Sequence, residues 1–293
     1  MKAYSYKKID AFAAGGSAGN PAACIYLTPG QALTPEEMLT IAQQHKGFVS
    51  EVVYCGQSDT ADVKLTYYSS ECEVDFCGHG TIACLYDLAA GDPRFAGKAQ
   101  ITVETNRKGV LSVSNRTADL GAVFITAPDP VHTGTALTRA DAAGALELPE
   151  DFLSAQLPID VINAGLATLI VPVARLTDEI GVFPDEARLK AFCEVQGVDI
   201  VLIFSLETAH KDYLAHTRVF APRFGYLEDP ATGSGNSAFG YYMRKHGLWD
   251  GSSIRIEQGG KDRVYNTIHL AAPDGPVQFG GGAVVRISGE YYI

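Results

Sequence analysis

The sequence predicts a mixed α/β (α+β) protein made of two pseudo-symmetric halves, each a β-barrel-like sheet wrapped around a central helix. Three observations predict this fold class. Short strand-like segments alternate with a few helices, and the order of these segments recurs after 149 to 155 residues. Each repeat also carries a glycine-rich bend directly before an apolar helix. A helix that is apolar on most sides belongs in the interior, surrounded by strands.

Length and composition are those of a globular protein with a substantial core. The chain has 293 residues, of which 46% are hydrophobic and 19% are charged. The net charge of -11 and the lack of a basic cluster weigh against a nucleic-acid partner. No apolar run approaches the roughly 20 residues of a membrane helix, and the first residues do not form a signal peptide. We expect a soluble, cytoplasmic protein whose six cysteines are reduced thiols.

The first helix is expected at 34–47. Thr34 is its N-cap and Pro35 occupies the first helical position, where a missing N–H group does no harm. Glu37 completes a capping box with Thr34, and Gly47 ends the helix. A strand is expected directly afterwards.

The second half repeats this order of elements. A helix at 184–197, from Pro184 to Gly197, lies 149 residues after the first helix and is again followed by a strand. Other aligned pairs, at spacings of 153 to 155 residues, are Lys64 with Arg218, Ile101 with Ile254, and Cys77 with Thr232. We therefore expect a first half at 1–127, completed by a C-terminal strand at 283–293, and a second half at 128–282.

Each half contains a glycine-rich bend before its apolar helix, at 77–80 and at 232–235. Glycine lets the backbone approach a ligand closely, and the unpaired N–H groups and dipole of the first helical turn favour an anion such as a carboxylate. Two such helices would present their N-termini to the cleft between the halves. The residues leave open the alternative that each glycine pair only makes a tight turn before a buried helix.

Polar side chains gather at these two bends. His79 lies on the first, and Glu228, Asp229, Thr232 and Ser234 lie on the second. The helix N-terminus should lower the pKa of His79, which would make it a neutral hydrogen-bond partner or proton carrier. The alternatives are that Asp229 belongs to an ordinary turn and that His79 is a packed, structural histidine.

Glu51 interrupts an otherwise apolar strand. Alternation along a strand leaves two orientations open, one toward solvent and one toward the cleft. A carboxylate in an apolar wall would be desolvated and would have a raised pKa, which is the condition for a general base near neutral pH.

Four cysteine and histidine side chains are candidates for metal binding. They are Cys72, Cys77, His79 and Cys84. Their spacing matches none of the common zinc patterns, and Cys84 falls inside the expected helix. We therefore expect no metal site.

Four segments carry a family resemblance: GNPAAC at 19–24, SEVVY at 50–54, CGHGTIA at 77–83 and EDPATGSG at 228–235. In this order they resemble the PhzF-like phenazine-biosynthesis isomerases, which share the diaminopimelate epimerase fold. The resemblance spans nearly the whole chain, and it implies an isomerase without cofactor or metal that is often a homodimer. Three departures are Gly80 where alanine is usual, Val52 where threonine is usual, and an altered segment at 258–266.

The resemblance also implies residue roles. The family's catalytic glutamate falls on Glu51, and its aspartate and histidine fall on Asp229 and His79. The implied substrate-binding residues are Asn20, Ser50, Gly78, Gly80, Thr232, Gly233 and Ser234.

The expected reaction moves a proton within a small unsaturated amino- or hydroxy-carboxylic acid, resembling trans-2,3-dihydro-3-hydroxyanthranilate isomerase. Glu51 would remove the proton and Asp229 or His79 would assist its return, with the helix N-termini holding the substrate carboxylate. Epimerases of this fold use two thiols, whereas here Cys77 is matched by Thr232, so Cys77 is interpreted as a small buried residue. The alternatives are a two-base epimerase or racemase of the same fold and a non-catalytic protein that binds small carboxylates.

Overall fold

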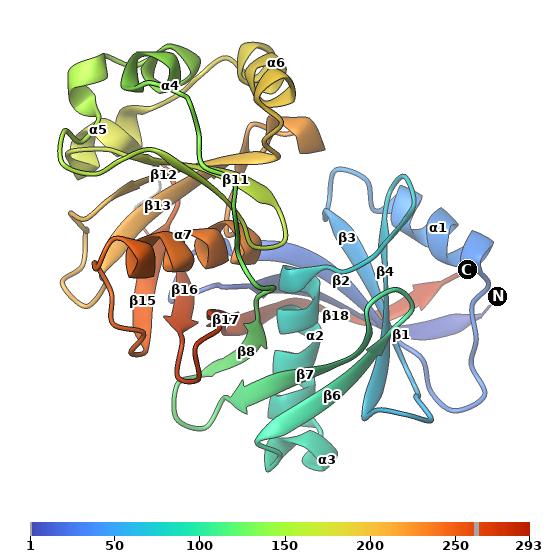
Figure 1. The fold of residues 1–293 in the computed structure, drawn as a ribbon. Coiled ribbons are helices and arrows are strands. Elements are labelled where there is room, and N and C mark those ends of the chain that lie inside the picture. The colour runs from blue at the N-terminus through green and yellow to red at the C-terminus, as the bar shows by residue number, and fades with distance from the viewer. Residues whose placement is uncertain (1, 261–263) are drawn as a thin grey trace. The chain divides into compact units, whose positions relative to one another are not determined.

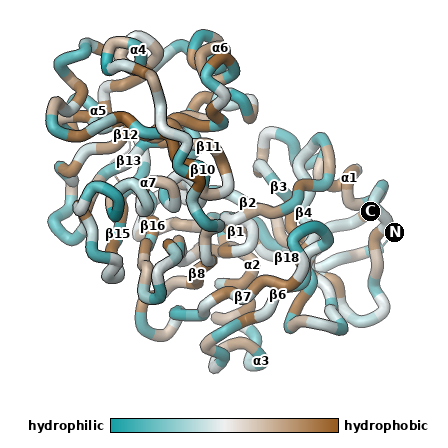
Figure 2. Tube along the Cα trace, in the orientation of Figure 1, coloured by the Kyte–Doolittle hydropathy of each residue, from teal (hydrophilic) through white to brown (hydrophobic). Residues whose placement is uncertain are grey.

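The computed structural model describes residues 2–260 and 264–293, which divide into two compact units (Figure 1). The first unit comprises Met1–Ile125 and Gly280–Ile293, and the second comprises Thr126–Phe279. Both units contain strands and helices, as the predicted mixed α/β class requires. Hydrophobic residues are concentrated in the strands of each unit, whereas the connecting loops are largely hydrophilic (Figure 2).

The first unit is a mixed sheet that contains both parallel and antiparallel strand pairs. Its elements are β1 (Ala3–Ala11), β2 (Asn20–Tyr26), α1 (Pro35–Gln44), β3 (Glu51–Gly56), β4 (Val63–Ser69), β5 (Glu73–Val74), α2 (Gly78–Gly91), α3 (Pro93–Ala96), β6 (Gln100–Thr105), β7 (Gly109–Arg116), β8 (Ala122–Thr126) and β18 (Ala283–Tyr292). Strand β1 pairs antiparallel with both β18 and β2. Strand β2 is parallel to β3, and β4 pairs antiparallel with β3 and parallel with β6. The C-terminal strand is therefore part of the first unit.

The second unit has the same order of pairings. Its elements are β9 (Val131–His132), α4 (Arg139–Ala145), β10 (Asp160–Asn163), β11 (Ala167–Pro172), α5 (Leu176–Gly181), α6 (Glu186–Gln196), β12 (Ile200–Ser205), β13 (Ala215–Phe220), β14 (Glu228–Asp229), α7 (Gly233–Lys245), β15 (Ile254–Gln258), β16 (Asn266–Ala271) and β17 (Gln278–Gly281). Strand β11 is parallel to β12, and β13 pairs antiparallel with β12 and parallel with β15. Strands β11, β12, β13 and β15 thus match β2, β3, β4 and β6.

The strand register corrects one alignment made from the sequence. Lys64 in β4 is opposite Glu104 in β6, and His216 in β13 is opposite Glu257 in β15. Lys64 therefore corresponds to His216 and not to Arg218, two residues further on. The shift preserves the inward or outward direction of the side chain, so hydrophobic alternation in the sequence could not detect it.

The first expected helix is confirmed together with its capping box, but it ends at Gln44 with His45 as C-cap and not at Gly47, because i−3 bonds such as His45 N to the Ala42 carbonyl tighten its last turn. The Thr34 side chain accepts a hydrogen bond from Glu37 N, and Glu37 Oε2 accepts one from Thr34 N. The expected helix from Pro184 begins later, because the Asp185 side chain accepts from Arg188 N and so caps a helix that starts at Glu186.

Helices α2 and α7 are the buried helices of the two units. Helix α2 buries most of its first two turns and packs against β1, β2, β3 and β18 of its own unit. Helix α7 is buried over nearly its whole length and packs against β10, β11, β12 and β16 of its own unit (Figure 1). The prediction of an interior helix bordered by strands is confirmed for each unit. No helix in the described ranges is long and apolar enough to cross a bilayer.

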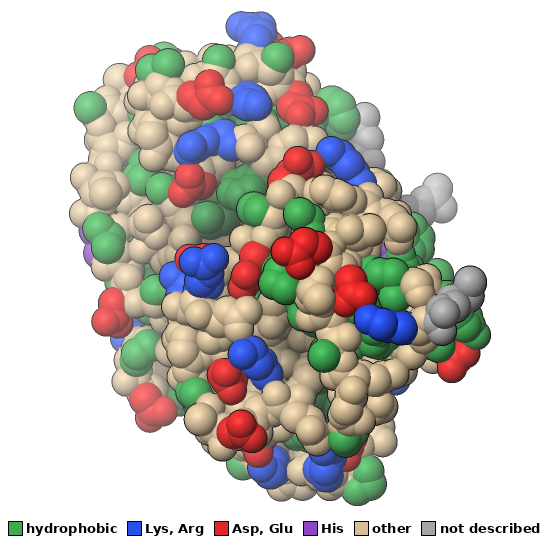
Figure 3. Space-filling view, turned by 90° about the vertical axis from the view of Figure 1, so that its right-hand side faces the viewer, with side chains coloured by type: hydrophobic (Ala, Val, Ile, Leu, Met, Phe, Trp, Pro, Cys, Tyr) green, Lys and Arg blue, Asp and Glu red, His purple; other side chains and the backbone are tan. Residues whose placement is uncertain are grey.

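Charged side chains are mixed on the surface. On the face drawn in Figure 3, Lys and Arg side chains lie beside Asp and Glu side chains and do not gather into a basic patch. Ion pairs such as Arg116 with Asp119 and Arg175 with Asp178 follow this pattern. Exposed pairs of this kind are screened by solvent and contribute little to the stability of the fold.

The second unit buries a group of ionisable side chains at β13. Glu179 and His216 are both fully buried, with His216 Nδ1 3.0 Å from Glu179 Oε1. Burial raises the pKa of Glu179 well above its usual 4.5 and lowers the pKa of His216 to about 4. Burial therefore favours the neutral form of both side chains. Arg218 lies next to them, where it pairs with Glu228 and donates to the carbonyls of Glu179 and Val182.

We predict that Glu179→Gln removes a pH dependence of stability. A raised pKa in the folded state means that the contribution of Glu179 is fully present below pH 4.5 and is lost as the pH rises toward the folded value. The loss is about 1.4 kcal/mol per pH unit in that window. Urea unfolding at pH 5, 5.5 and 6, directly above the ordinary value of 4.5, should show the free energy of unfolding of the wild type falling relative to Glu179→Gln. Exposed Glu194→Gln is the control, and parallel curves for the wild type and Glu179→Gln would contradict the prediction.

Candidate active site

Glu51 faces helix α2 from the first position of β3. Val52 and Tyr54 pack with Ile41 of α1 on one face of this strand. Val53 lies on the other face, against Gly80 of α2. Because side chains alternate along a strand, Glu51 shares the face of Val53. Its side chain is 23% exposed, so the orientation toward solvent that the sequence left open is not the one adopted.

The N-terminus of α2 lies beside Glu51. Cys77 is the N-cap, and its Sγ accepts a hydrogen bond from Gly80 N at 3.3 Å. Thr81 Oγ1 donates to the Cys77 carbonyl at 2.7 Å and accepts a hydrogen bond from Tyr67 Oη. These contacts fix the first helical turn, in which His79 lies.

Three side chains of different chemistry meet at this point. His79 Nε2 lies 3.2 Å from Glu51 Oε2, and the Cys77 thiol donates to the same oxygen at 3.8 Å. The sulfur also lies 3.6 Å from His79 Nδ1 and 3.8 Å from His79 Nε2. Cys77 is buried, as the sequence predicted, and its thiol also contacts the Glu51 carboxylate, which the sequence did not predict.

The cysteines considered for zinc do not assemble. Cys72 is exposed, and the fully buried Cys84 interacts with Cys24 and Cys55 in the core. Over residues 2–260 and 264–293, the ligand-type side chains that lie together are those of Glu51, Cys77 and His79. The Cys77 sulfur lies beside the His79 ring, 3.6 and 3.8 Å from its two nitrogens, so the three side chains as placed do not fit a tetrahedral ion. The sequence pattern missed this grouping because Glu51 joins through strand pairing and not through spacing along the chain.

Burial determines the ionisation of Glu51. Removal of water from around the carboxylate raises its pKa from 4.5 to about 7, and the hydrogen bond from the Cys77 thiol acts in the opposite direction. A carboxylate that titrates near neutral pH is present in both forms under physiological conditions. It can therefore accept a proton from carbon and release it again.

The N-terminus of α7 is organised differently. Thr232 is its N-cap, but the Thr232 hydroxyl donates to Asp229 Oδ2 at 2.5 Å and makes no capping bond. Gln258 Oε1 accepts from Thr232 N and from Asn236 Nδ2. Gln258 Nε2 donates to the Asp229 carbonyl and to Thr232 Oγ1. Asp229, Thr232 and Asn236 are therefore joined by one fully buried glutamine.

Sequence reasoning missed Gln258 as part of this site. It was noted only as the first residue of the altered segment 258–266, of which 261–263 lie outside the described residues. Glutamine in a strand is ordinarily exposed, so the sequence provided no reason to expect a buried Gln258. Its place at the end of β15, directly before a glycine, is the signal that could have drawn attention to it.

The other predicted binding residues have known places in the fold. Asn20 is a buried residue at the start of β2, and Ser50 is exposed directly before β3. The glycines and the serine lie at the starts of the two buried helices: Gly78, Gly80, Gly233 and Ser234. Their roles toward a ligand stay predictions.

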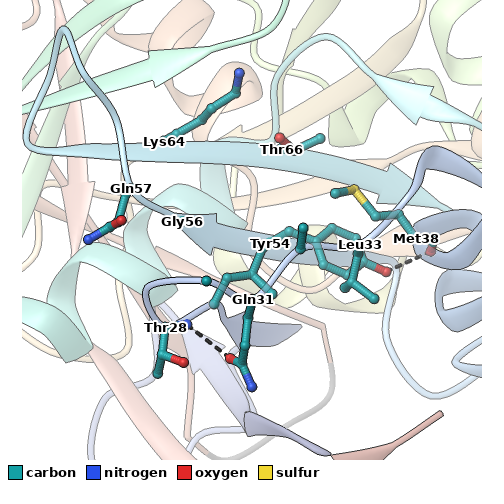
Figure 4. A pocket seen from close by; sticks show the side chains of 12 residues that line it. Thr28, Gln31, Leu33, Met38, Tyr54, Gly56, Gln57, Lys64 and Thr66 are labelled. Carbon is teal, nitrogen blue, oxygen red and sulfur yellow. Dashed lines mark hydrogen bonds between the residues drawn. The ribbon is translucent and has the colours of Figure 1, made fainter. Parts of the chain in front are cut away.

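A cavity of about 260 Å³ lies elsewhere in the first unit (Figure 4). It is lined by Leu33, Met38, Tyr54 and Thr66 among others, and the Tyr54 hydroxyl donates to the Met38 carbonyl. Tyr54 is on the face of β3 that packs on α1, so this cavity and Glu51 are on opposite faces of the strand.

Comparison with known proteins identifies the family. The PhzC-PhzF profile, described as phenazine biosynthesis-like protein, matches residues 9–289. The chain belongs to this family. It is 34% identical over 275 residues to the uncharacterized isomerase YfhB of Bacillus subtilis, covering 89% of each chain. It is 28% identical over 305 residues to the uncharacterized isomerase YddE of Escherichia coli O157:H7, covering 97% of each.

Solved structures of PhzF proteins have the same fold. The PhzF-family phenazine biosynthesis protein of Bacillus anthracis superposes with a TM-score of 0.86 at 27% identity, covering 100% of both chains. A hydroxyproline epimerase of Agrobacterium vitis, at 11% identity and a TM-score of 0.58, covers 99% of this chain and 92% of its own. The second likeness shows the fold alone. The predicted family and fold class are confirmed.

We predict that Cys77→Ala raises the pKa of Glu51 above about 7. The variant removes the thiol hydrogen bond that stabilises the carboxylate and leaves the burial that raises its pKa. Difference infrared spectroscopy of the carboxylate stretch, against Glu51→Gln, measures this titration. Cys72→Ser, which changes an exposed thiol, should leave it unchanged, and an unchanged or lowered value in Cys77→Ala would contradict the prediction.

We predict that Gly80→Ala destabilises this protein by about 1–2 kcal/mol. A Cβ at Gly80 would lie 2.6 Å from Val53 Cγ2 and 3.0 Å from Cys77 Sγ. In a Val53→Ala background the same change should cost less, because the shorter contact is gone, only the contact with Cys77 Sγ stays close, and alanine favours the helix. Gly91→Ala, in open space on α2, is the control. Urea unfolding of the four variants tests this, and equal effects in both backgrounds would contradict it.

Proposed function

We propose that the protein is a cofactor-independent isomerase that moves a proton within a small unsaturated amino- or hydroxy-carboxylic acid, with Glu51 as the general base. The observation that carries the proposal is the position of the Glu51 carboxylate, largely buried at the N-terminus of α2 and in contact with His79 and Cys77. Membership of the PhzF family and relatives named isomerases support it.

The reaction needs a base strong enough to take a proton from carbon. Because burial raises the pKa of Glu51 to about 7, its carboxylate is a stronger base than an exposed glutamate and is still ionised in a large fraction of molecules at neutral pH. Once protonated, Glu51 becomes the acid that can return the proton to another carbon of the conjugated system. One residue can therefore both remove and return the proton on a single face of the substrate.

His79 and the first turn of α2 support the developing charge. His79 Nε2 lies 3.2 Å from Glu51 Oε2, so the imidazole can orient the carboxylate and share its proton. The N–H groups of the first helical turn favour the negative charge of a substrate carboxylate or of the delocalised intermediate. Asp229, Thr232, Gly233 and Ser234 keep the roles that the family resemblance implies.

The two-base alternative receives no support from the N-caps. Cys77 caps α2 and Thr232 caps α7, and the Thr232 hydroxyl donates its proton to Asp229. A threonine hydroxyl is far too weakly acidic to replace the second thiol of an epimerase. A homodimer and a cytoplasmic location also stay predictions of the sequence.

We predict that the wild type catalyses incorporation of solvent deuterium into members of a panel of small unsaturated amino- and hydroxy-carboxylic acids, and that Glu51→Gln slows this by about 10²–10⁴-fold. The amide keeps the size of the side chain and cannot accept the proton. Mass spectrometry and proton NMR of the recovered acids measure the label. The wild-type rate should rise with pH through about 7, because the base acts in its deprotonated form.

Glu71→Gln is the matched control, because it changes an exposed carboxylate of the same unit that pairs with Lys46. Equal labelling by the wild type and Glu51→Gln would remove Glu51 from the reaction. Inversion at a stereocentre that is abolished in Cys77→Ser and retained in Glu51→Gln would favour the epimerase instead. Binding of an acid without any labelling would favour the non-catalytic alternative.

A further inference from the structure

The side-chain amide of Gln258 makes hydrogen bonds at both of its ends. Its oxygen accepts from Thr232 N at 2.9 Å and from Asn236 Nδ2 at 2.7 Å. Its nitrogen donates to the Asp229 carbonyl at 2.9 Å and to Thr232 Oγ1 at 3.1 Å. Gln258 is fully buried, so both N–H groups of the amide are used and each has a protein acceptor.

Backbone groups determine the direction of every bond in this network. Thr232 N can only donate and the Asp229 carbonyl can only accept, so the two ends of the Gln258 amide cannot be exchanged. Because Gln258 Nε2 donates to Thr232 Oγ1, the proton of that hydroxyl points to its other neighbour, Asp229 Oδ2, 2.5 Å away. Gln258 therefore determines that Thr232 is the donor and Asp229 the acceptor.

The strands on both sides of β15 hold Gln258 in place. Gln258 lies opposite Thr217 in the parallel strand β13 and opposite Asn266 in the antiparallel strand β16. Asp229 is in turn paired with Val219 of β13. The whole network lies in the second unit, and regular elements carry it, which keeps the positions of its side chains precise.

We propose that Gln258 is a positioning residue of the isomerase, which holds the Thr232 hydroxyl as a donor and thereby fixes the orientation of the Asp229 carboxylate. The part of Asp229 in proton transfer rests on the proposed function, whereas the hold on its carboxylate follows from the contacts of the second unit. A group that is already oriented needs no rearrangement before it acts. Misplacement of such a group by about 1 Å can lower a rate about 10²-fold.

Titration of Asp229 tests the hold without substrate. Difference infrared spectroscopy against Asp229→Asn measures the pKa of this carboxylate. A hydrogen bond to the charged form lowers the pKa of a carboxyl group, so Thr232→Val, which removes the donor, should raise the pKa of Asp229. Gln258→Met, which keeps the length of the side chain and removes the amide, should shift it in the same direction. Gln196→Met, at an exposed glutamine of the same unit, is the matched control and should leave it unchanged.

Kinetics with the acid that the wild type labels fastest test the role in the reaction. The kcat of Thr232→Val and of Gln258→Met should each fall about 10–100-fold. The double variant should be about as slow as the slower single variant, because both changes remove the same hold. Thr232→Ser, which restores a hydroxyl, should be at least about tenfold faster than Thr232→Val. Circular dichroism of each variant checks that it is folded.

The outcomes separate the two proposals. An Asp229 titration that is the same in the wild type, Thr232→Val and Gln258→Met overturns the hold. If the titration shifts but the wild type labels none of the acids, the proposed function fails while the hold stands. If the wild type labels an acid and both single variants keep its kcat, the positioning role is overturned. Losses that multiply in the double variant overturn the action of Gln258 through Thr232.

Discussion

The proposed site depends on the removal of water from a single carboxylate, that of Glu51. Burial disfavours the charged form and the hydrogen bond from the Cys77 thiol favours it, so the pKa of about 7 is a balance of two opposing effects. The close approach of α2 to β3 produces both effects. That approach is possible because Gly80 has no side chain where a Cβ would lie 2.6 Å from Val53.

The two buried helices begin with the same backbone geometry and different chemistry. The Cys77 sulfur caps α2 and contacts Glu51, whereas the Thr232 hydroxyl donates to Asp229 and leaves Thr232 N to Gln258. One helix N-terminus is thus associated with a titratable carboxylate and a thiol, and the other with a fully hydrogen-bonded polar network. This asymmetry favours proton transfer by one base over proton transfer by a pair of equivalent thiols.

Buried polar groups also hold the strand that carries Asp229. Arg218 forms two parallel hydrogen bonds with Glu228 in β14, and its Nη1 group donates to the carbonyls of Glu179 and Val182 at the end of α5. A buried bidentate pair of this kind is strong and permits few alternative arrangements of the two side chains. Asp229 is the residue after Glu228, so its backbone position is set by that ion pair from one side and by Gln258 from the other.

The sequence by itself determined the features that depend on neighbours along the chain. Capping residues defined α1, the glycine bends defined the starts of α2 and α7, and the four motifs defined the family. The tertiary structure alone decided what depends on strand pairing: the direction of Glu51, its contact with Cys77, the register that matches Lys64 with His216, and the central place of Gln258. Local propensities act over a few residues, whereas these contacts join segments that the fold brings together from 26 or more residues apart along the chain.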